Sequence, residues 1–228
     1  MSLEIIDGVG TSSHVTSDQV GLAQTGTVTP DAVILDVGAK LSYEIVSNNQ
    51  VNVKDGTFMI QGKRGCIAPG TVEACEIANG TAGLYRNDLI CIKYTKDAET
   101  KVEEYTIEVV QGTPGEQGTD PTVTTGDIND GALVHYAPLY RVVINGLNIE
   151  SVTLLFSDVK GLKALEQLIG ELNTELEDYW KKIWPVGSIY MSVNATNPGS
   201  LFGGTWVAWG TGRVPVAINT GDADFNTV

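Results

Sequence analysis

The sequence predicts a mainly β protein: an N-terminal antiparallel β-sandwich or barrel-like domain, then one long helix, then a small β-rich segment. Short stretches between residues 32 and 156 alternate apolar and polar residues and are separated by Gly-containing turns, which predicts strands. A heptad repeat of large apolar residues between 162 and 183 predicts a coiled-coil helix. Only 18% of the residues are charged and 26 are glycine, a composition that favours turn-rich β structure over a helical bundle.

The strands are expected to follow an N-terminal stretch that is rich in Gly, Ser and Thr and has no period. We expect residues 1 to 30 to be a loop or an extended arm. Asp55 and Gly56 form a dipeptide that favours tight turns, so a hairpin is expected there. Residues 112–121 are expected to be an exposed loop. The expected strands are 32–37, 41–46, 51–54, 57–61, 72–77, 88–94, 104–110, 137–144 and 149–156.

The helix is expected to run from a cap at Ser157 or Asp158 to the residue before Pro185. Its large apolar residues recur at alternating steps of three and four, which places them on one narrow stripe. Polar residues occupy nearly all other positions, so the stripe needs partner helices, most simply from other copies of the chain. An amphipathic helix packed on its own β domain is the alternative. The expected seam residues are Leu162, Leu165, Ile169, Leu172, Leu176, Tyr179 and Ile183.

The charge of the chain excludes some classes of partner. Acidic residues outnumber basic ones, 28 to 14, and the formal net charge is −14. Because such a surface repels phosphate backbones and anionic lipids, we expect binding to neither nucleic acid nor membranes. No segment is apolar enough to span a bilayer, and the first residues lack the features of a signal peptide, so we expect assembly in the cytoplasm.

The three cysteines cannot all pair within one chain. The spacing of Cys66, Cys75 and Cys91 matches neither a zinc site nor a Cys-x-x-Cys redox motif. We expect free thiols, as in a chain made in a reducing compartment. A bridge between Cys66 and Cys75 across a hairpin is the alternative.

No motif in the sequence indicates catalysis. His14 and His135 are the only histidines, and they lie far apart without ligand spacing. No nucleophile elbow and no phosphate-binding loop occurs. We therefore expect no enzymatic activity, no cofactor and no metal. The loop aspartates that we considered as cation ligands lack the order of a calcium loop: Asp120, Asp127, Asp130, Asp222 and Asp224.

Three motifs follow one another in residues 184–218: a Pro-Val-Gly-Ser turn from Pro185, a Phe-Gly-Gly-Thr-Trp turn from Phe202, and a Gly-Arg-Val-Pro strand from Gly212. In their order and spacing they resemble the tail-collar module of bacteriophage tail fibres and baseplate proteins. The residues that carry the resemblance are Pro185, Gly187, Ser188, Pro198, Leu201, Phe202, Gly203, Gly204, Trp206, Gly212, Arg213 and Pro215.

The first part of the chain carries a looser likeness in the short stretches 14–16, 44–49, 59–62, 86–89 and 138–142. Through these stretches, residues 1–155 are similar to N-terminal modules of prophage tail proteins of Gram-positive bacteria.

The resemblance implies a homotrimeric structural protein of a phage tail tip, baseplate or tail fibre, located in the virion. The expected domains are a β-rich attachment domain at 1–155, a trimeric coiled-coil helix at 156–184, and a collar-like, incomplete segment at 185–228. Partners would be other copies of the chain and other tail proteins. The His pairs with which some members of the family bind metal are missing from this sequence, so no metal role is implied.

Two other functions are alternatives. Tyr190, Trp206 and Trp209, with Phe202 nearby, could form an aromatic platform for bacterial surface polysaccharide, which would make the chain a receptor-binding protein. Aromatic residues beside Gly turns more often fill a small core, however. The third hypothesis is an enzyme that degrades cell-wall polymer, for which the sequence offers no motif.

Overall fold

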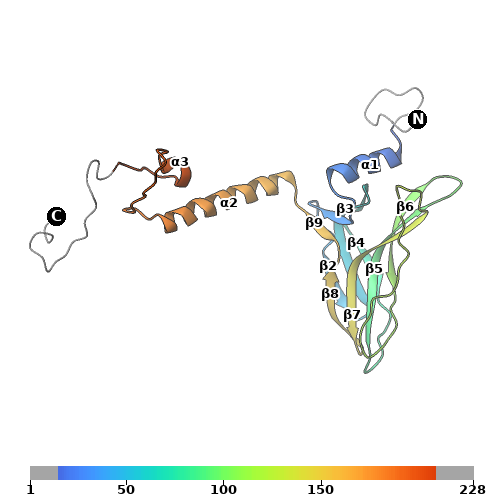
Figure 1. The fold of residues 1–228 in the computed structure, drawn as a ribbon. Coiled ribbons are helices and arrows are strands. Elements are labelled where there is room, and N and C mark those ends of the chain that lie inside the picture. The colour runs from blue at the N-terminus through green and yellow to red at the C-terminus, as the bar shows by residue number, and fades with distance from the viewer. Residues whose placement is uncertain (1–14, 209–228) are drawn as a thin grey trace, which may run out of the picture. The chain divides into compact units, whose positions relative to one another are not determined.

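The structure is a computed structural model that describes residues 15–208, and it confirms the prediction of a mainly β protein. The chain divides after Gly161 into two compact units. The first is a β domain with one short helix, and the second starts with the long helix (Figure 1). The elements are α1 (Ser17–Thr27), β1 (Val33–Leu35), β2 (Tyr43–Ser47), β3 (Gln50–Ile60), β4 (Lys63–Glu76), β5 (Tyr85–Lys96), β6 (Glu103–Val110), β7 (Val134–Asn145), β8 (Asn148–Leu154), β9 (Ser157–Val159), α2 (Leu162–Ile183) and α3 (Gly199–Phe202).

The first sheet is built around β3, which is hydrogen-bonded along both of its edges. β4 takes one edge over the whole length of β3. β2 and β1 share the other edge, end to end: Ile45 of β2 lies opposite Val51, and Ile34 of β1 lies opposite Phe58. β9 pairs with the free edge of β1, so β2 and β9 lie on the same side of β3.

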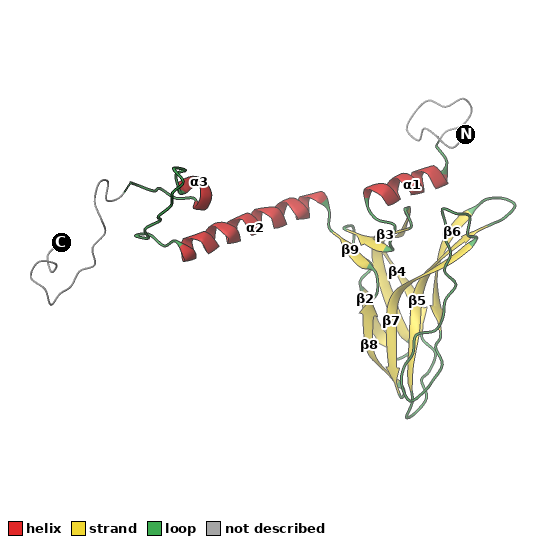
Figure 2. Cartoon of the chain, viewed as in Figure 1, coloured by secondary structure: helices red, strands yellow, loops and turns green. Residues whose placement is uncertain are grey.

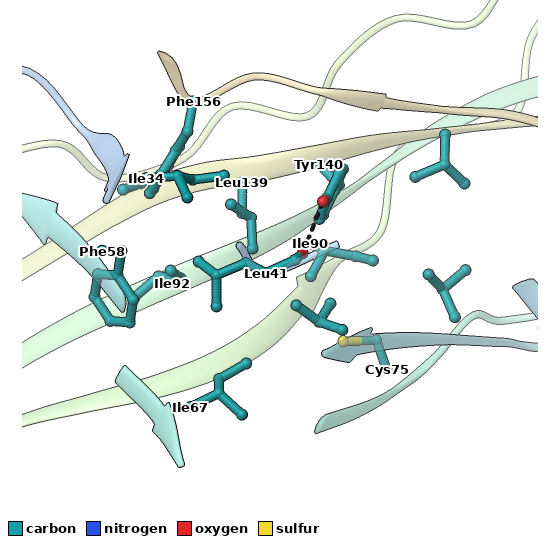
Figure 3. Close-up of a cluster of buried hydrophobic side chains, with 14 of the residues drawn as sticks. Ile34, Leu41, Phe58, Ile67, Cys75, Ile90, Ile92, Leu139, Tyr140 and Phe156 are labelled. Carbon is teal, nitrogen blue, oxygen red and sulfur yellow. Dashed lines mark hydrogen bonds between the residues drawn. The ribbon is translucent and has the colours of Figure 1, made fainter. Parts of the chain in front are cut away.

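The second sheet has the order β6-β5-β7-β8, with antiparallel neighbours throughout. The two sheets pack face to face as a sandwich (Figure 2). Their shared core includes Ile34 from the first sheet and Ile90 and Leu139 from the second (Figure 3). The Tyr140 hydroxyl donates a hydrogen bond of 2.8 Å to the Leu41 carbonyl, which ties the sheets together inside the core.

The prediction of wholly antiparallel sheets is wrong at β9, which pairs in parallel with β1. The chain leaves β8 at the edge of the second sheet and crosses to the first, and Phe156 is buried at the crossing. The predicted helix start at Ser157 or Asp158 is also wrong, because these residues pair with β1 and the helix begins at Leu162. Pairing with β1 satisfies backbone groups that the first turn of a helix leaves without partners.

The predicted hairpin at Asp55 and Gly56 is wrong, because β3 runs through both residues. The turn to β4 lies at Gln61 and Gly62, which both have positive φ. The register between β3 and β4 shifts next to Gly56, and a Cβ there would lie 2.5 Å from the backbone nitrogen of Leu41. Glycine is thus needed for a bulge and a close backbone approach rather than for a turn.

Helix α1 forms where the sequence predicted a loop or an extended arm. The Thr16 hydroxyl accepts a hydrogen bond from the Gln19 backbone, and the Gln19 side chain accepts one from the Thr16 backbone, which makes a capping box. Gly21 packs so closely on the β3–β4 turn that a Cβ on Gly62 would lie 1.9 Å from the Gly21 oxygen. Because so short a helix is marginal alone, α1 depends on this docking.

An ionic cluster around Lys63 holds α1 on the β domain. Lys63 Nζ lies 2.7 Å from the Asp18 carboxylate and 3.0 Å from the Ser17 hydroxyl, both on α1. It also donates to Glu103 on β6, which accepts a further bond of 2.8 Å from the Tyr94 hydroxyl. Burial by itself raises the pKa of Glu103, but the hydrogen bonds from Lys63, Ser17 and Tyr94 outweigh it and lower the pKa to about 2.

A buried ion pair fixes the loops at the other end of β5. The Arg86 and Asp88 side chains are 3% and 0% exposed, and two guanidinium nitrogens each lie 2.8 Å from a carboxylate oxygen. Arg86 also donates to the carbonyls of Ala78 and Asn79, and Asp88 accepts from the backbone of Gly112. The pair therefore ties the β4–β5 connection and the loop after β6 to one strand.

All three cysteines are free, as predicted. Cys66 and Cys75 lie on the same strand, opposite Thr57 and Val51 of β3, and so are roughly 20 Å apart. This spacing rules out the alternative bridge. Burial raises the pKa of the Cys75 thiol to about 11 and that of Cys91 to about 12, which leaves the exposed Cys66 as the more reactive thiol.

The Glu103 cluster makes stability depend on acid pH. The depressed pKa of about 2, against an ordinary 4.5, means that the unfolded chain takes up the proton first as the pH falls. The stabilisation is complete above pH 4.5 and is lost between there and pH 2. In Glu103→Gln, the unfolding free energy should decrease less between about pH 5 and about pH 3 than it does in wild type. Urea titrations at the two pH values measure this decrease. The exposed Glu99→Gln is the control, and equal slopes for Glu103→Gln and wild type would contradict the assignment.

The buried Arg86–Asp88 pair predicts that removing one of the two charges lowers the unfolding free energy more than removing both. Asp88→Ala leaves the Arg86 charge buried without its partner and should cost about 3–5 kcal/mol of unfolding free energy. The double change Arg86→Met with Asp88→Leu removes both charges and should cost less than Asp88→Ala. Denaturant unfolding of both variants measures this, and a double variant that is less stable than Asp88→Ala would refute it.

Candidate functional site

The apolar stripe of α2 is open to solvent along the whole helix. None of the residues of α2 is buried. Exposure of the stripe runs from 44% at Leu165 and Ile183 to 87% at Leu162. All the predicted seam residues lie on this helix: Leu162, Leu165, Ile169, Leu172, Leu176, Tyr179 and Ile183.

Sequence reasoning missed Leu168, which is 39% exposed and precedes the seam residue Ile169. Counting only the first and fourth heptad positions leaves it out. A broader helical-face count would have found it, because it widens the stripe on one flank. Lys181 and Lys182 lie in the last turn, where positive charge complements the helix dipole.

The helix end passes into the first of the predicted turns. The Trp184 backbone still donates to the Trp180 carbonyl, and the Ser188 backbone then donates a hydrogen bond of 2.9 Å to the Pro185 carbonyl. Gly187 has φ 97°, a conformation that glycine adopts at the third position of such a turn without strain. The Pro-Val-Gly-Ser motif is therefore the turn that reverses the chain after α2.

The chain then folds an aromatic cluster onto the end of α2. The Phe202 ring stacks on Trp184 with centroids 5.6 Å apart and lies 5.1 Å from the Trp180 ring. Tyr190 lies 5.4 Å from Phe202, and Trp206 lies 6.1 Å from Trp184. Such spacings are typical of packed aromatic pairs, so these five rings form a small core within the second unit.

The Phe-Gly-Gly-Thr-Trp motif builds one wall of this aromatic cluster. Gly203 and Gly204 have φ 71° and 75°, a left-handed region that favours glycine. The turn brings the Trp206 indole back, and its Nε1 donates a hydrogen bond of 2.9 Å to the Gly203 carbonyl. The segment was predicted to be β-rich, but between residues 185 and 208 the structure has the short helix α3 and turns, and no strand.

The residues considered for sugar contact separate into two groups. Tyr190 and Trp206 are half-buried members of the aromatic cluster, with ring centroids 6.2 Å apart. Trp209 lies outside the described residues. Sugar contact stays a prediction, and the observed packing is the one expected of rings that fill a small core.

The residues considered for metal binding are dispersed. Asp120 is ion-paired with Arg141, and the Asp127 carboxylate accepts hydrogen bonds from the backbone of Asn129 and Asp130. Between residues 15 and 208, no group of three or more His, Cys, Asp or Glu side chains could hold a metal ion.

Within the same range, no helix is long and apolar enough to cross a membrane. His14, Asp222, Asp224, Gly212, Arg213 and Pro215 lie outside the described residues.

The C-terminal part of the chain matches the model of a known protein family. Residues 179–228 match the family model of the baseplate structural protein Gp10, C-terminal domain. The match starts at Tyr179, in the last turns of α2, and includes the Pro-Val-Gly-Ser and Phe-Gly-Gly-Thr-Trp turns and all five rings of the aromatic cluster. No curated protein matches the chain.

The match supports a structural protein of a phage baseplate, and with it a place in the virion tail. The resemblance inferred from the Pro-Val-Gly-Ser and Phe-Gly-Gly-Thr-Trp motifs is thus confirmed as far as a baseplate protein. A tail-collar module and a role in a tail fibre stay predictions.

The aromatic cluster predicts a specific spectroscopic change. Phe202→Ala removes the ring that contacts the other four and should destabilise the cluster by roughly 2 kcal/mol, less than in a fully buried core. Near-ultraviolet circular dichroism should weaken and tryptophan emission should shift to longer wavelength. Val207→Ala, at a position 85% exposed, is the control. Unchanged spectra in Phe202→Ala would show that the rings do not pack as described.

Proposed function

We propose that this chain is a homotrimeric structural protein of a phage tail baseplate, in which three α2 helices form a coiled coil between a tail-attachment domain and a host-facing module. The observation that carries the proposal is the stripe of α2, which is apolar and exposed over the full length of a helix with no buried residue. The baseplate family match starts at the end of this same helix, which supports a role in tail assembly.

The energetics favour association of α2. Burial of a large apolar side chain contributes about 1.5–3 kcal/mol, so a stripe of this length offers on the order of 10–20 kcal/mol for each helix. Association costs roughly 4–15 kcal/mol in lost freedom of motion. The first heptad positions alternate between Leu and Ile, so the seam departs from the arrangement of Ile at the first and Leu at the fourth position that favours dimers, but this composition does not by itself set the number of helices.

The two ends of the proposed coiled coil have different roles. The β domain, up to Gly161, would attach to other tail proteins, and the segment after Pro185 would form the base of the collar-like module that faces the host. The role is mechanical and needs neither catalysis nor a cofactor. His135 is buried, and its Nδ1 lies 3.1 Å from the backbone nitrogen of Gly126.

The trimer is tested by one charge placed on either face of α2. Leu172→Asp would put three carboxylates in one layer of the coiled coil, where they are desolvated and repel one another, and should leave monomers. Thr174→Asp adds the same charge two positions later, on the other side of the helix, and should leave the assembly unchanged. Light scattering or sedimentation should give three times 24.3 kDa for wild type and Thr174→Asp.

The same measurement can overturn the proposal. A wild-type chain that sediments as a monomer at micromolar concentration would remove the basis for a coiled coil. A Leu172→Asp chain of unchanged mass would show that the stripe of α2 does not hold the copies together.

A further inference from the structure

The strands β4 and β6 lie side by side at one side of the sandwich and leave a hollow between them, which we term the β4–β6 hollow. Each strand pairs on one edge only, β4 with β3 and β6 with β5. The hollow has a volume of about 350 Å³ and opens to solvent. Its apolar walls are formed by Phe58, Ile67, Ile92, Tyr105 and Ile107. Phe58, Ile67 and Ile92 also belong to the shared core (Figure 3), so the hollow reaches the interior of the sandwich.

Glu73 of β4 places a carboxylate at the rim of this apolar hollow. It lies opposite the fully buried Val53 of β3, so its side chain is on the core-facing side of the strand. Alternation normally puts an apolar residue at such a position. Glu73 is nevertheless exposed, and its carboxylate forms no ion pair or hydrogen bond with any side chain between residues 15 and 208. The hollow therefore combines apolar walls with an unpaired negative charge.

The basic side chains of the neighbouring strands are engaged elsewhere. Lys63 and Lys93 pair with carboxylates of β6 other than those in the hollow. Arg64 lies opposite Met59, on the other face of β4, and donates to Gln24 of α1. A cation for Glu73 therefore has to come from outside the described part of the chain.

The free edge of β6 is continuous, whereas that of β4 is interrupted. In β4, residues 68–71 leave the ladder with β3, and Gly70 within them has φ 73°. β6 contains neither lysine nor proline, which commonly guard a sheet edge, and its charged residues are all acidic: Glu103, Glu104 and Glu108. Such an edge disfavours another acidic strand and admits a basic one. A strand added to β6 would place every second side chain on the core-facing side, next to the hollow.

The chemistry of the hollow fits a lysine or arginine side chain. Each has an apolar stem that packs along apolar surface and a charged head that stays near water. The apolar walls would receive the stem, and the Glu73 carboxylate at the rim would bind the head. A second copy of this chain is a poor source of such a segment, because each copy carries a net charge of −14 and the copies repel one another. A different, basic polypeptide is the matching occupant.

We infer that the β4–β6 hollow is a docking site for an extended, basic segment of another tail protein, which adds a strand to β6 and inserts a lysine or arginine side chain toward Glu73. This inference rests on the proposed role of the β domain in attachment to other tail proteins. It does not depend on the coiled coil, because all the residues that form the hollow belong to the β domain.

Protection of the native Cys66 thiol tests the inference in the full-length chain. Cys66 lines the hollow and is exposed, while Cys75 and Cys91 are buried, so the rate of maleimide labelling reports on the hollow. The probe is a synthetic peptide of about eight residues, a usual strand length, in which threonine and valine alternate and one valine is replaced by lysine. A second peptide carries glutamate in place of the lysine. A third has proline on both sides of the lysine, which removes backbone donors needed for pairing with β6.

The lysine peptide should slow the labelling of Cys66 about fivefold or more when it fills the hollow, while the glutamate and proline peptides should leave the rate unchanged. Glu73→Gln should weaken binding of the lysine peptide about fivefold, near the upper end for an exposed ion pair. Glu76→Gln is the matched control, because it removes the same charge from the opposite face of β4 and should leave binding unchanged. Circular dichroism checks that both variants fold.

Several results would overturn the inference. These are no protection by the lysine peptide, equal protection by the glutamate or proline peptide, and equal binding to wild type and Glu73→Gln. Slow labelling of wild type without peptide that becomes fast in Leu172→Asp would show that a copy of this chain fills the hollow instead. Each of these results leaves the proposed trimer standing, because the trimer is judged from the mass of the chains. A wild-type monomer that binds the lysine peptide as described would refute the trimer and support the docking site.

Discussion

The apolar stripe of α2 has to be removed from water by something outside its own helix, and this constraint governs the second unit of the chain. A helix of 22 residues is about 33 Å long, and helices of this kind are marginally stable in water without tertiary contacts. Gly170 lowers its intrinsic stability further, because glycine costs about 1 kcal/mol relative to alanine inside a helix. Burial of the stripe is therefore the main term available to keep the helix folded.

The end of α2 carries two apolar faces, one covered by the aromatic cluster and one exposed. Trp180 and Trp184 lie four positions apart, so they project from one face and together receive the Phe202 ring. Tyr179 and Ile183 precede them by one position each and continue the exposed stripe. The chain thus covers one face of the helix with its own turns and leaves the other face exposed.

Alternation of apolar and polar residues predicted most strands, because successive side chains of a strand point to opposite faces of the sheet. The heptad repeat predicted α2, because its spacing places the apolar residues on one stripe of a helix. The errors arose where tertiary contact outweighed a local signal. Gly56 looks like a turn residue but is needed because Leu41 approaches the strand. Helix α1 lacks an apolar period, although Thr16 and Gln19 have the spacing of a capping box that could have indicated its start. The exposure of Tyr43, Ile45 and Leu154, which lie opposite buried residues, depends on how the two sheets meet, and no local pattern encodes this.

The short parallel strand β9 brings the chain to the edge of the first sheet directly before α2. Its backbone is paired with β1, which leaves Lys160 and Gly161 between the last strand and the first residue of the helix. Lys40 and then the Gly161 backbone hydrogen-bond the Asp36 carboxylate and lower its pKa, so the end of the connection is itself held by the sheet.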